Sequence, residues 1–310
     1  MTMFQHHKSN KLPWEQGPVY DISWSSDGSQ LSAVGSRGYA RSWRLERGGH
    51  KDGEELKALG NEIERLAWCP GPQNANLLAG ASYDKTVQMW DQRANGAATK
   101  LATRGQISDI CWSPSGRYFA AVGREDGLDV FDVAGGAAQT AMVSAAFDDL
   151  AYLVRWDVSE RLLLLATHQG SVEVYEWPTM QPLTTIPAHA GACNCVGVDP
   201  RGSVLATGGA DATMELWSTD DFAMTRVIDG YESPLRFADF NMDGRFIASA
   251  SDDLDIKIHD SFSGDLVHKL DVDSLTTALE WHPRNLALAY GSAGTGKGSS
   301  KAGVTIFLRS

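Results

Sequence analysis

Residues 193–217 show the pattern of apolar and polar positions that the whole chain repeats. Three apolar, alternating segments, CNCVGV, SVLATGG and TMELW, are separated by the turn signals DPRG and ADA. Alternation predicts half-buried strands, and Gly, Pro and Asp between the segments predict tight turns. The sequence therefore predicts an antiparallel meander of three strands here.

The same unit recurs seven times along the chain, and its period indicates the fold. From one repeat to the next, the bulky residue that ends the first strand lies 41 to 44 residues further on. It falls at Trp24, Trp68, Trp112, Trp156, Val198, Phe240 and Trp281. A period of about 40 to 45 residues is typical of propeller blades with four strands each. We therefore predict an all-β fold, a seven-bladed β-propeller.

The two ends of the chain are predicted to close the ring. Only three strands of the seventh repeat lie at the C-terminus, so residues 10–16 should supply the fourth. We expect residues 1–16 to form an arm that carries this closing strand, and residues 17–310 to form the propeller. Residues 1–9 are polar and are expected to be loosely held, and the polar stretch 46–55 is expected to form a loop.

Four residues in and before the fifth repeat have the groups needed for a buried chain of hydrogen bonds. Trp217 can only donate and Asp211 can only accept, whereas Thr207 and His189 can do both. A chain in the order Trp, Thr, His, Asp leaves no buried group without a partner. Only the fifth repeat has a histidine nine residues before its first-strand anchor, so the other blades are expected to rely on apolar packing.

Two patterns look like catalytic motifs, but each lacks a part that the chemistry needs. His189, Thr207 and Asp211 have the residue types of a hydrolytic triad, yet a tryptophan would cover the hydroxyl that must attack. Residues 291–298, GSAGTGKG, match a phosphate-binding loop up to its lysine. Gly298 stands where a Ser or Thr must hold magnesium, and a strand rather than a helix is expected to follow. We expect a flexible insertion at this place.

Composition and cysteine spacing narrow the class of protein further. The 27 Lys and Arg residues against 39 Asp and Glu give a net charge of −12, which disfavours nucleic acid and suits basic protein partners. The four cysteines have no zinc-site or C-x-x-C spacing, so we expect free thiols in a reducing compartment. No paired carboxylates stand out beyond surface acids. The sequence therefore indicates a protein that is not an enzyme, with no catalytic, cofactor or metal site.

Two further features concern targeting. The N-terminus has no apolar segment of the kind that a signal peptide carries. The longest apolar run, residues 162–167, is far too short to span a bilayer. We therefore expect neither a signal peptide nor a membrane segment.

The turns that join the second and third strands of each blade are expected to ring one mouth of the propeller. Tyr and Arg are common anchors of protein interfaces. We therefore select residues of these turns as candidate partner-binding residues: Arg37, Tyr83, Arg124, His168 and Asp252.

Short strings in the repeats resemble those of WD40 proteins: WSSDG, WSPSG, DPRG and NMDG at the first turn, and MWDQ, FDVA and HDSF at the end of the third strand. Over residues 17–310 the chain further resembles the THO complex subunit 3 family, the WD-repeat subunit of the THO/TREX mRNA-export complex. The most specific likeness is AHAGACNCVGVDPRGSVLATGGADATMELW. Arg37 and Gly38 depart from the usual turn in the first repeat.

The resemblance implies a nuclear scaffold that takes part in transcription-coupled mRNP packaging and mRNA export. It implies larger helical THO subunits as partners, RNA contacted at most indirectly, and no membrane. No basic cluster for nuclear import stands out, so entry into the nucleus would depend on partners.

Residues 79–93 leave a second functional interpretation open. The segment AGASYDKTVQMWDQR ends in W-D-x-R and nearly fits a box that resembles the one in substrate receptors of cullin-based ubiquitin ligases. Ala79 stands where that box has a larger aliphatic residue, and ordinary repeats also produce W-D-x-R. The alternative function is therefore a WD-repeat substrate receptor of such a ligase.

Overall fold

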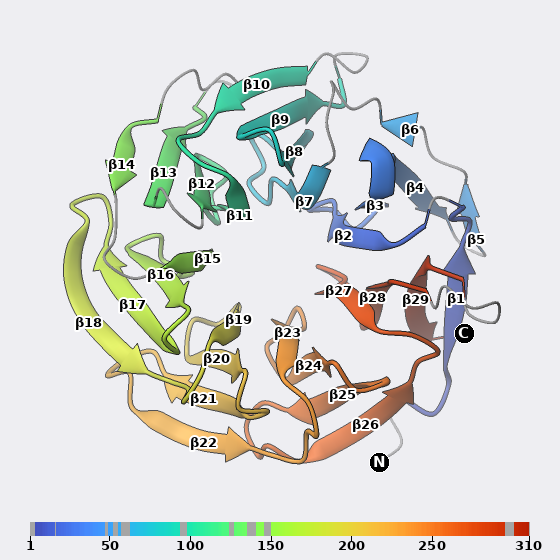
Figure 1. The fold of residues 1–310 in the computed structure, drawn as a ribbon. Helices are drawn as coiled ribbons and strands as arrows, with labels where there is room; N and C mark the ends of the chain where they lie inside the picture. Colours follow the sequence, from blue (N-terminus) through green and yellow to red (C-terminus); the bar gives the residue numbers. More distant parts are fainter. Residues whose placement is uncertain are drawn as a thin grey trace.

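Seven antiparallel sheets, here called blades one to seven in chain order, stand in a ring around a central channel (Figure 1). The computed structural model describes residues 4–15, 17–46, 49–51, 55–56, 63–93, 98–123, 127–134, 141–145, 150–294 and 301–309. Among these residues, six sheets have four strands and the sheet of blade one has five. The predicted seven-bladed all-β propeller is confirmed.

In blades one to six the strands run from the channel to the rim in chain order, and in blade seven the order is β27, β28, β29 and then β1. The innermost, first strands are β2 (Val19–Trp24), β7 (Ile63–Trp68), β11 (Ile107–Trp112), β15 (Ala151–Trp156), β19 (Cys193–Val198), β23 (Leu235–Phe240) and β27 (Thr276–Trp281). The second strands are β3 (Gln30–Gly35), β8 (Leu77–Ser82), β12 (Tyr118–Gly123), β16 (Leu162–Thr167), β20 (Val204–Gly209), β24 (Phe246–Ser251) and β28 (Ala287–Ser292).

The third strands are β4 (Ala40–Glu46), β9 (Thr86–Asp91), β13 (Gly127–Asp132), β17 (Ser171–Glu176), β21 (Met214–Ser218), β25 (Asp255–Asp260) and β29 (Gly303–Arg309). The outermost, fourth strands are β5 (Gly49–Lys51), β6 (Glu55–Leu56), β10 (Ala98–Ala102), β14 (Val143–Ala145), β18 (Gln181–Pro187), β22 (Met224–Ile228), β26 (Leu266–Asp271) and β1 (His7–Leu12). A short 3-10 helix, η1 (Ser36–Gly38), joins β3 to β4. No helix in the described ranges is long and apolar enough to cross a membrane.

The up-and-down order of the strands gives the ring two distinct faces. Turns between first and second strands, such as residues 157–161, lie on one face together with the loops between third and fourth strands. We call it the first-turn face. Turns between second and third strands, such as residues 36–39, lie on the opposite face, which we call the second-turn face.

The core of the protein lies between the blades. The described residues form seven buried apolar clusters, and each cluster fills one junction between two neighbouring blades. Second strands such as β8 are buried at every position because both faces of the sheet are covered by neighbours. Each large apolar side chain removed from water stabilises the fold by about 1.5–3 kcal/mol. Apolar packing between blades is therefore the main force that holds the ring.

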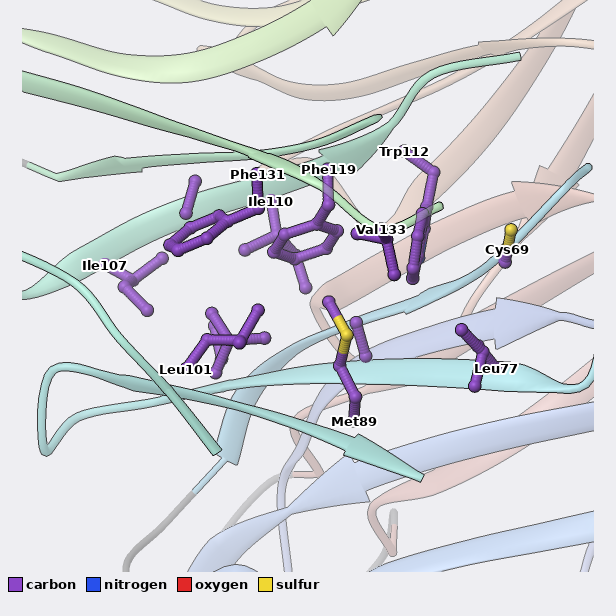
Figure 2. Packing of buried hydrophobic residues seen from close by; sticks show 14 residues of the cluster. Cys69, Leu77, Met89, Leu101, Ile107, Ile110, Trp112, Phe119, Phe131 and Val133 are labelled. Atoms are coloured by element: carbon purple, nitrogen blue, oxygen red, sulfur yellow. The ribbon is translucent and has the colours of Figure 1, made fainter. Parts of the chain in front are cut away.

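Figure 2 shows the junction between blades two and three. Met89 and Leu101 of blade two face Phe119 and Phe131 of blade three. These positions follow from alternation, since one face of each third strand meets the next blade. Trp112 packs edge-on against Phe119, with ring centroids 4.9 Å apart.

The N-terminal strand closes blade seven, although it begins and ends earlier than the predicted residues 10–16. Strand β1 pairs antiparallel with β29, from His7 opposite Arg309 to Leu12 opposite Val304. Pro13 follows the strand and has no N–H with which to continue the ladder.

Phe4 explains why the closing strand begins before residue 10. For the described residues 4–9, it also corrects the expectation that this segment is loosely held. Its side chain is only 3% exposed. The ring lies 5.4 Å from that of Phe246, 6.2 Å from that of Phe307 and 6.4 Å from that of Trp281. Phe4 therefore fixes the chain to blades six and seven just before β1.

The polar stretch 46–55, expected to be a loop, also contributes strands. β5 pairs with β4 from Arg44 opposite Lys51 to Glu46 opposite Gly49. β6 pairs with the beginning of the same strand, Ala40 and Arg41. The edge of blade one is thus covered in two short pieces, which reduces the number of unpaired backbone groups there.

Phe4→Ala should lower the free energy of unfolding by about 3 kcal/mol, the lower end of the range for a buried phenylalanine, because a terminal segment can relax into the space. Lys8→Ala changes an exposed residue of β1, the strand that follows Phe4, and should alter stability by less than about 0.5 kcal/mol. Urea denaturation measures both. Equal midpoints for the two variants would show that Phe4 does not anchor the closing strand.

Candidate functional site

The first strands present an unpaired edge to the channel, and side chains of the preceding blade supply acceptors for some of its N–H groups. At the junction of blades one and two, Asp21 accepts the N–H of Leu66 at 2.8 Å and the Ser23 hydroxyl accepts that of Trp68 at 3.1 Å. Three further carboxylates make the same contact with the next blade: Asp109 with Val154 N (3.1 Å), Asp239 with Trp281 N (2.7 Å) and Glu280 with Trp24 N (3.0 Å).

The tryptophans that end the first strands make a second type of bond between blades. The indole N–H of Trp112 donates to the carbonyl of Ala67 at 3.0 Å, and that of Trp281 donates to the carbonyl of Asp239 at 3.1 Å. Trp24 reaches the carbonyl of Glu280 at 3.4 Å. The repeated tryptophan thus holds each of these blades against the preceding one.

Charged side chains of these strands line a channel of about 950 Å³. Arg155 donates to Asp109 at 2.6 Å, and Arg65 donates to the carbonyl of Ser108 at 3.1 Å. The side chains of Asp21, Asp239 and Glu280 also line it.

Desolvation alters the pKa values of three of the channel carboxyls. It raises the pKa of Asp21 and that of Asp239 to about 6. The pKa of Glu280 lies well above its usual range because of desolvation and the nearby charges of Asp239 and Asp21. The channel therefore holds carboxyl groups that gain protons far more readily than surface acids.

The expectation that no carboxylates are grouped was wrong, because Asp21, Asp109, Asp239 and Glu280 line the same channel. Asp21 and Asp109 lie three residues before a first-strand anchor, and Asp239 and Glu280 lie one residue before theirs. These two positions point to the same side of a strand. Alignment of the repeats on their anchors is the signal that would have found them. Because each carboxylate already accepts a backbone N–H, the group is suited to holding blades together.

The four residues of the fifth repeat lie within hydrogen-bonding distance in the expected order. Trp217 Nε1 donates to Thr207 Oγ1 at 3.0 Å, and His189 Nε2 lies 3.0 Å from the same oxygen. His189 Nδ1 lies 3.0 Å from Asp211 Oδ1. The chain runs from the core to the second-turn face, since the side chain of His189 is fully buried and that of Asp211 is partly exposed.

Burial lowers the pKa of His189, although the carboxylate of Asp211 opposes this shift. A neutral ring can donate from Nδ1 to Asp211 and accept at Nε2 from Thr207, which satisfies both nitrogens. The hydroxyl of Thr207 is enclosed between Trp217 and His189. No reacting group can approach it, so the arrangement is suited to a structural role.

Blade six contains a shorter form of this network that the sequence analysis missed. Tyr231 and Ser249 stand 42 residues after His189 and Thr207, and their hydroxyls are 2.7 Å apart. Asp253 accepts the N–H of Glu232 at 3.1 Å, as Asp211 accepts that of Ala190 at 3.0 Å. The sequence signal was the position of Tyr231, which lies nine residues before the first-strand anchor Phe240, as His189 lies nine residues before Val198. A tyrosine hydroxyl at this position can replace the histidine ring as the hydrogen-bond partner of Ser249.

The candidate partner-binding residues are spread over separate blades. Arg37, Tyr83 and His168 are exposed on the second-turn face of blades one, two and four. Asp252 of blade six lines the channel mouth, where Arg236 donates to it at 2.7 Å. Arg124 lies outside the described residues. The structure does not bring these residues together, and their role remains a prediction.

At the remaining sequence motifs, the described residues are not arranged as a catalytic, phosphate-binding or metal-binding site. Of the glycine-rich segment, residues 295–300 lie outside the described part of the chain, and strand β29 follows it where a phosphate loop needs a helix. Burial raises the pKa of Cys69 to about 11 and that of Cys195 to about 12, so these free thiols are protonated and unreactive. Arg93 of the W-D-x-R string donates to Asp91 at 2.7 Å. Within the described ranges, no group of three or more His, Cys, Asp or Glu is arranged to hold a metal ion.

A ring of seven blades, in which the described residues form six sheets of four strands and one of five and a tryptophan ends five of the first strands, defines a WD-repeat propeller protein. The family model described as WD domain, G-beta repeat matches residues 53–91, 99–128, 180–218 and 223–260. The chain belongs to the THO complex subunit 3 family. It is 31% identical to THO complex subunit 3 of Arabidopsis thaliana over 289 residues, which cover 93% of this chain and 90% of that protein.

Two other relatives share less of their length with this chain. WD repeat-containing protein AAC3 of Dictyostelium discoideum is 28% identical over 87% of this chain and 60% of its own. Protein FIZZY-RELATED 1 of Arabidopsis thaliana is 21% identical over 69% of this chain and 36% of its own. The likeness to THO complex subunit 3 thus extends along nearly the whole of both proteins, unlike these two.

His189→Ala should lower the free energy of unfolding by about 1–3 kcal/mol, because it leaves the buried hydroxyl of Thr207 without an acceptor for its proton and removes one hydrogen bond from Asp211. His6→Ala replaces an exposed histidine and serves as the control. Urea midpoints of the two variants make the comparison. If they shift equally, the network does not contribute to stability.

Asp239→Asn should gain stability relative to the wild type as the pH rises from 4.5 to 7.5. The folded carboxyl, with its pKa raised from 3.8 to about 6, keeps a proton that the unfolded chain loses, so its ionisation destabilises the fold over this range. The amide still accepts the N–H of Trp281 and does not ionise. We expect a relative gain on the order of 1 kcal/mol.

Asp91→Asn is the control for this pH experiment. Hydrogen bonds from Arg93 hold the pKa of Asp91 below its usual range, so the aspartate contributes stability that is lost only in more acidic solution. This variant should show no gain between pH 4.5 and 7.5. If the difference in stability between Asp239→Asn and the wild type also stayed constant between pH 4.5 and 7.5, desolvation in the channel would not raise the pKa of Asp239 as described.

Proposed function

We propose that this protein is a non-enzymatic scaffold subunit of a THO-like nuclear complex that couples transcription to mRNP packaging and mRNA export. The observation that carries the proposal is the 31% identity to THO complex subunit 3 over 93% of the chain. A likeness of this extent includes all seven blades, whereas a shared repeat alone would cover one or a few of them. It supports a common place in an assembly as well as a common fold.

The chemistry of the described residues supports a scaffold. The polar groups that resemble a catalytic set, His189, Thr207 and Asp211, are joined in an internal chain. The channel carboxylates accept backbone N–H groups of neighbouring blades. A net charge of −12 favours basic protein surfaces over phosphate groups. The proposed partners are therefore other THO-type subunits, with RNA contacted at most indirectly.

The test is a tagged pulldown from nuclear extract of the source cells after nuclease treatment, read by mass spectrometry. We expect THO-type subunits in stoichiometric amounts. Their loss on nuclease treatment would show that RNA, and not a protein interface, links them. Recovery of a cullin adaptor without any THO-type subunit, and its loss on Arg93→Ala, would replace the proposal by the ligase-receptor interpretation.

A further inference from the structure

Exposed apolar side chains gather on one part of the ring. The described residues include twelve exposed large hydrophobic side chains, and six of these lie on the first-turn face of three consecutive blades, four to six. They belong to turns on that face or to the beginnings of the fourth strands that start from it: Val158, Leu183, Met224, Met242, Phe262 and Leu266. Phe262 is 89% exposed. Of the six, Val158 and Leu183 line one groove. Exposed apolar side chains that gather on one face mark an interaction site more often than scattered residues do.

The second-turn face differs. Its four exposed large hydrophobic side chains in the described ranges are Tyr83, Leu150, Leu254 and Leu275, which belong to blades two, four, six and seven or to the loops that lead into them. They are interrupted by blades without such a residue. Apolar character therefore distinguishes the first-turn face of blades four to six from the opposite side.

A groove of about 540 Å³ lies within this surface, between blades four and five. Leu162, Trp177, Leu183 and Phe222 line it. Trp177 is held edge-on against Trp156, with ring centroids 5.1 Å apart. One wall of the groove is therefore a rigid aromatic group, which loses little entropy when a ligand packs against it.

Five acidic side chains of this face have no basic partner, and two of them line the groove. Glu176 and Asp220 line it, and Asp221, Asp243 and Asp265 lie on the same face. All five are exposed, and none forms an ion pair with a basic residue of the described chain.

Two basic side chains of the same face are paired: Arg201 with Asp199 at 3.0 Å, and Arg245 with Asp260 at 3.6 Å. Arg161 lines the groove and donates to the hydroxyl of Ser159 at 3.3 Å. Against this one cation, the lining of the groove contains the carboxylates of Asp157, Glu176 and Asp220, so the charge beside the apolar side chains is negative on balance.

We propose that the first-turn face of blades four to six is the docking surface for a basic, amphipathic segment of a partner protein. Apolar side chains of the segment enter the groove beside Trp177 and Leu183, and its Lys or Arg residues meet Glu176 and Asp220. The inference deepens the proposed function and rests on it for the identity of the partner, but the chemistry of the segment follows from this chain alone. A second copy of the protein does not fit, because two acidic faces would meet in a symmetric dimer.

A synthetic 18-residue peptide of Leu and Lys at helical spacing is the probe, and fluorescence anisotropy measures its dissociation constant. Leu183→Lys removes an apolar contact at the edge of the groove, adds a charge that repels the Lys residues of the peptide, and should weaken binding about tenfold. Leu254→Lys is the matched control, since Leu183 is 50% exposed and Leu254 is 55% exposed on the opposite face. It should leave the constant within about twofold of the wild type.

The double variant Glu176→Gln, Asp220→Asn tests the charge and keeps the shape of both side chains. It should weaken binding and reduce the dependence on salt, because exposed charge pairs are screened. A Leu and Glu peptide of the same pattern should not bind. The proposal is overturned if Leu254→Lys weakens binding as much as Leu183→Lys, if the acidic peptide binds equally well, or if light scattering shows a dimer that Leu183→Lys dissociates.

The assembly provides a second readout that separates this inference from the proposed function. Wild-type protein that recovers THO-type subunits, while Leu183→Lys loses at least one of them, supports both. Equal recovery by the two proteins overturns the docking surface and leaves the proposed function intact. Wild-type protein that recovers no such subunit overturns the proposed function, and the peptide measurements then decide on the surface.

Discussion

The backbone N–H groups on the channel side of the innermost strands have no further strand to pair with, and the ring depends on how they are satisfied. At four of the seven junctions a carboxylate from the preceding blade accepts one of them: Asp21, Asp109, Asp239 or Glu280. Such a bond only forms if the two blades keep a fixed distance and register. The same hydrogen bonds therefore satisfy the N–H groups at the strand edges and set the distance between neighbouring blades. The apolar clusters fill the space between the blades at that distance.

Features that repeat along the chain were predictable from the sequence, because each repeat shows the same pattern of apolar, polar and turn residues. The anchors at Trp24, Trp112 and Trp281 marked the ends of first strands, and the structure shows the reason: their indole N–H groups reach the preceding blade. Alternation placed Met89 on the face that meets blade three. The order of donors and acceptors from Trp217 to Asp211 followed from side-chain chemistry alone.

Features that depend on a single position or on ring closure were missed. Phe4 lies in a polar segment and has no counterpart in the other repeats, so only the pocket formed by blades six and seven explains its burial. The carboxyl of Glu280 meets Trp24 across nearly the whole length of the chain, and no local pattern indicates that contact. Tyr231 was missed for a third reason, since it performs the task of a histidine with a different side chain.

Pairing of the first and last strands also determines when the protein can be completed during synthesis. Strand β1 is translated before the other strands of the ring, but its partner β29 is translated after them. Until β29 is made, β1 lacks a neighbour, and the surface of blade one that blade seven will cover is exposed to water. The growing propeller therefore has open strand edges and exposed apolar surface, which favour aggregation, while most of its blades are translated. Closure of the ring is a late step that joins distant parts of the chain, and it can follow only after β29 has left the ribosome.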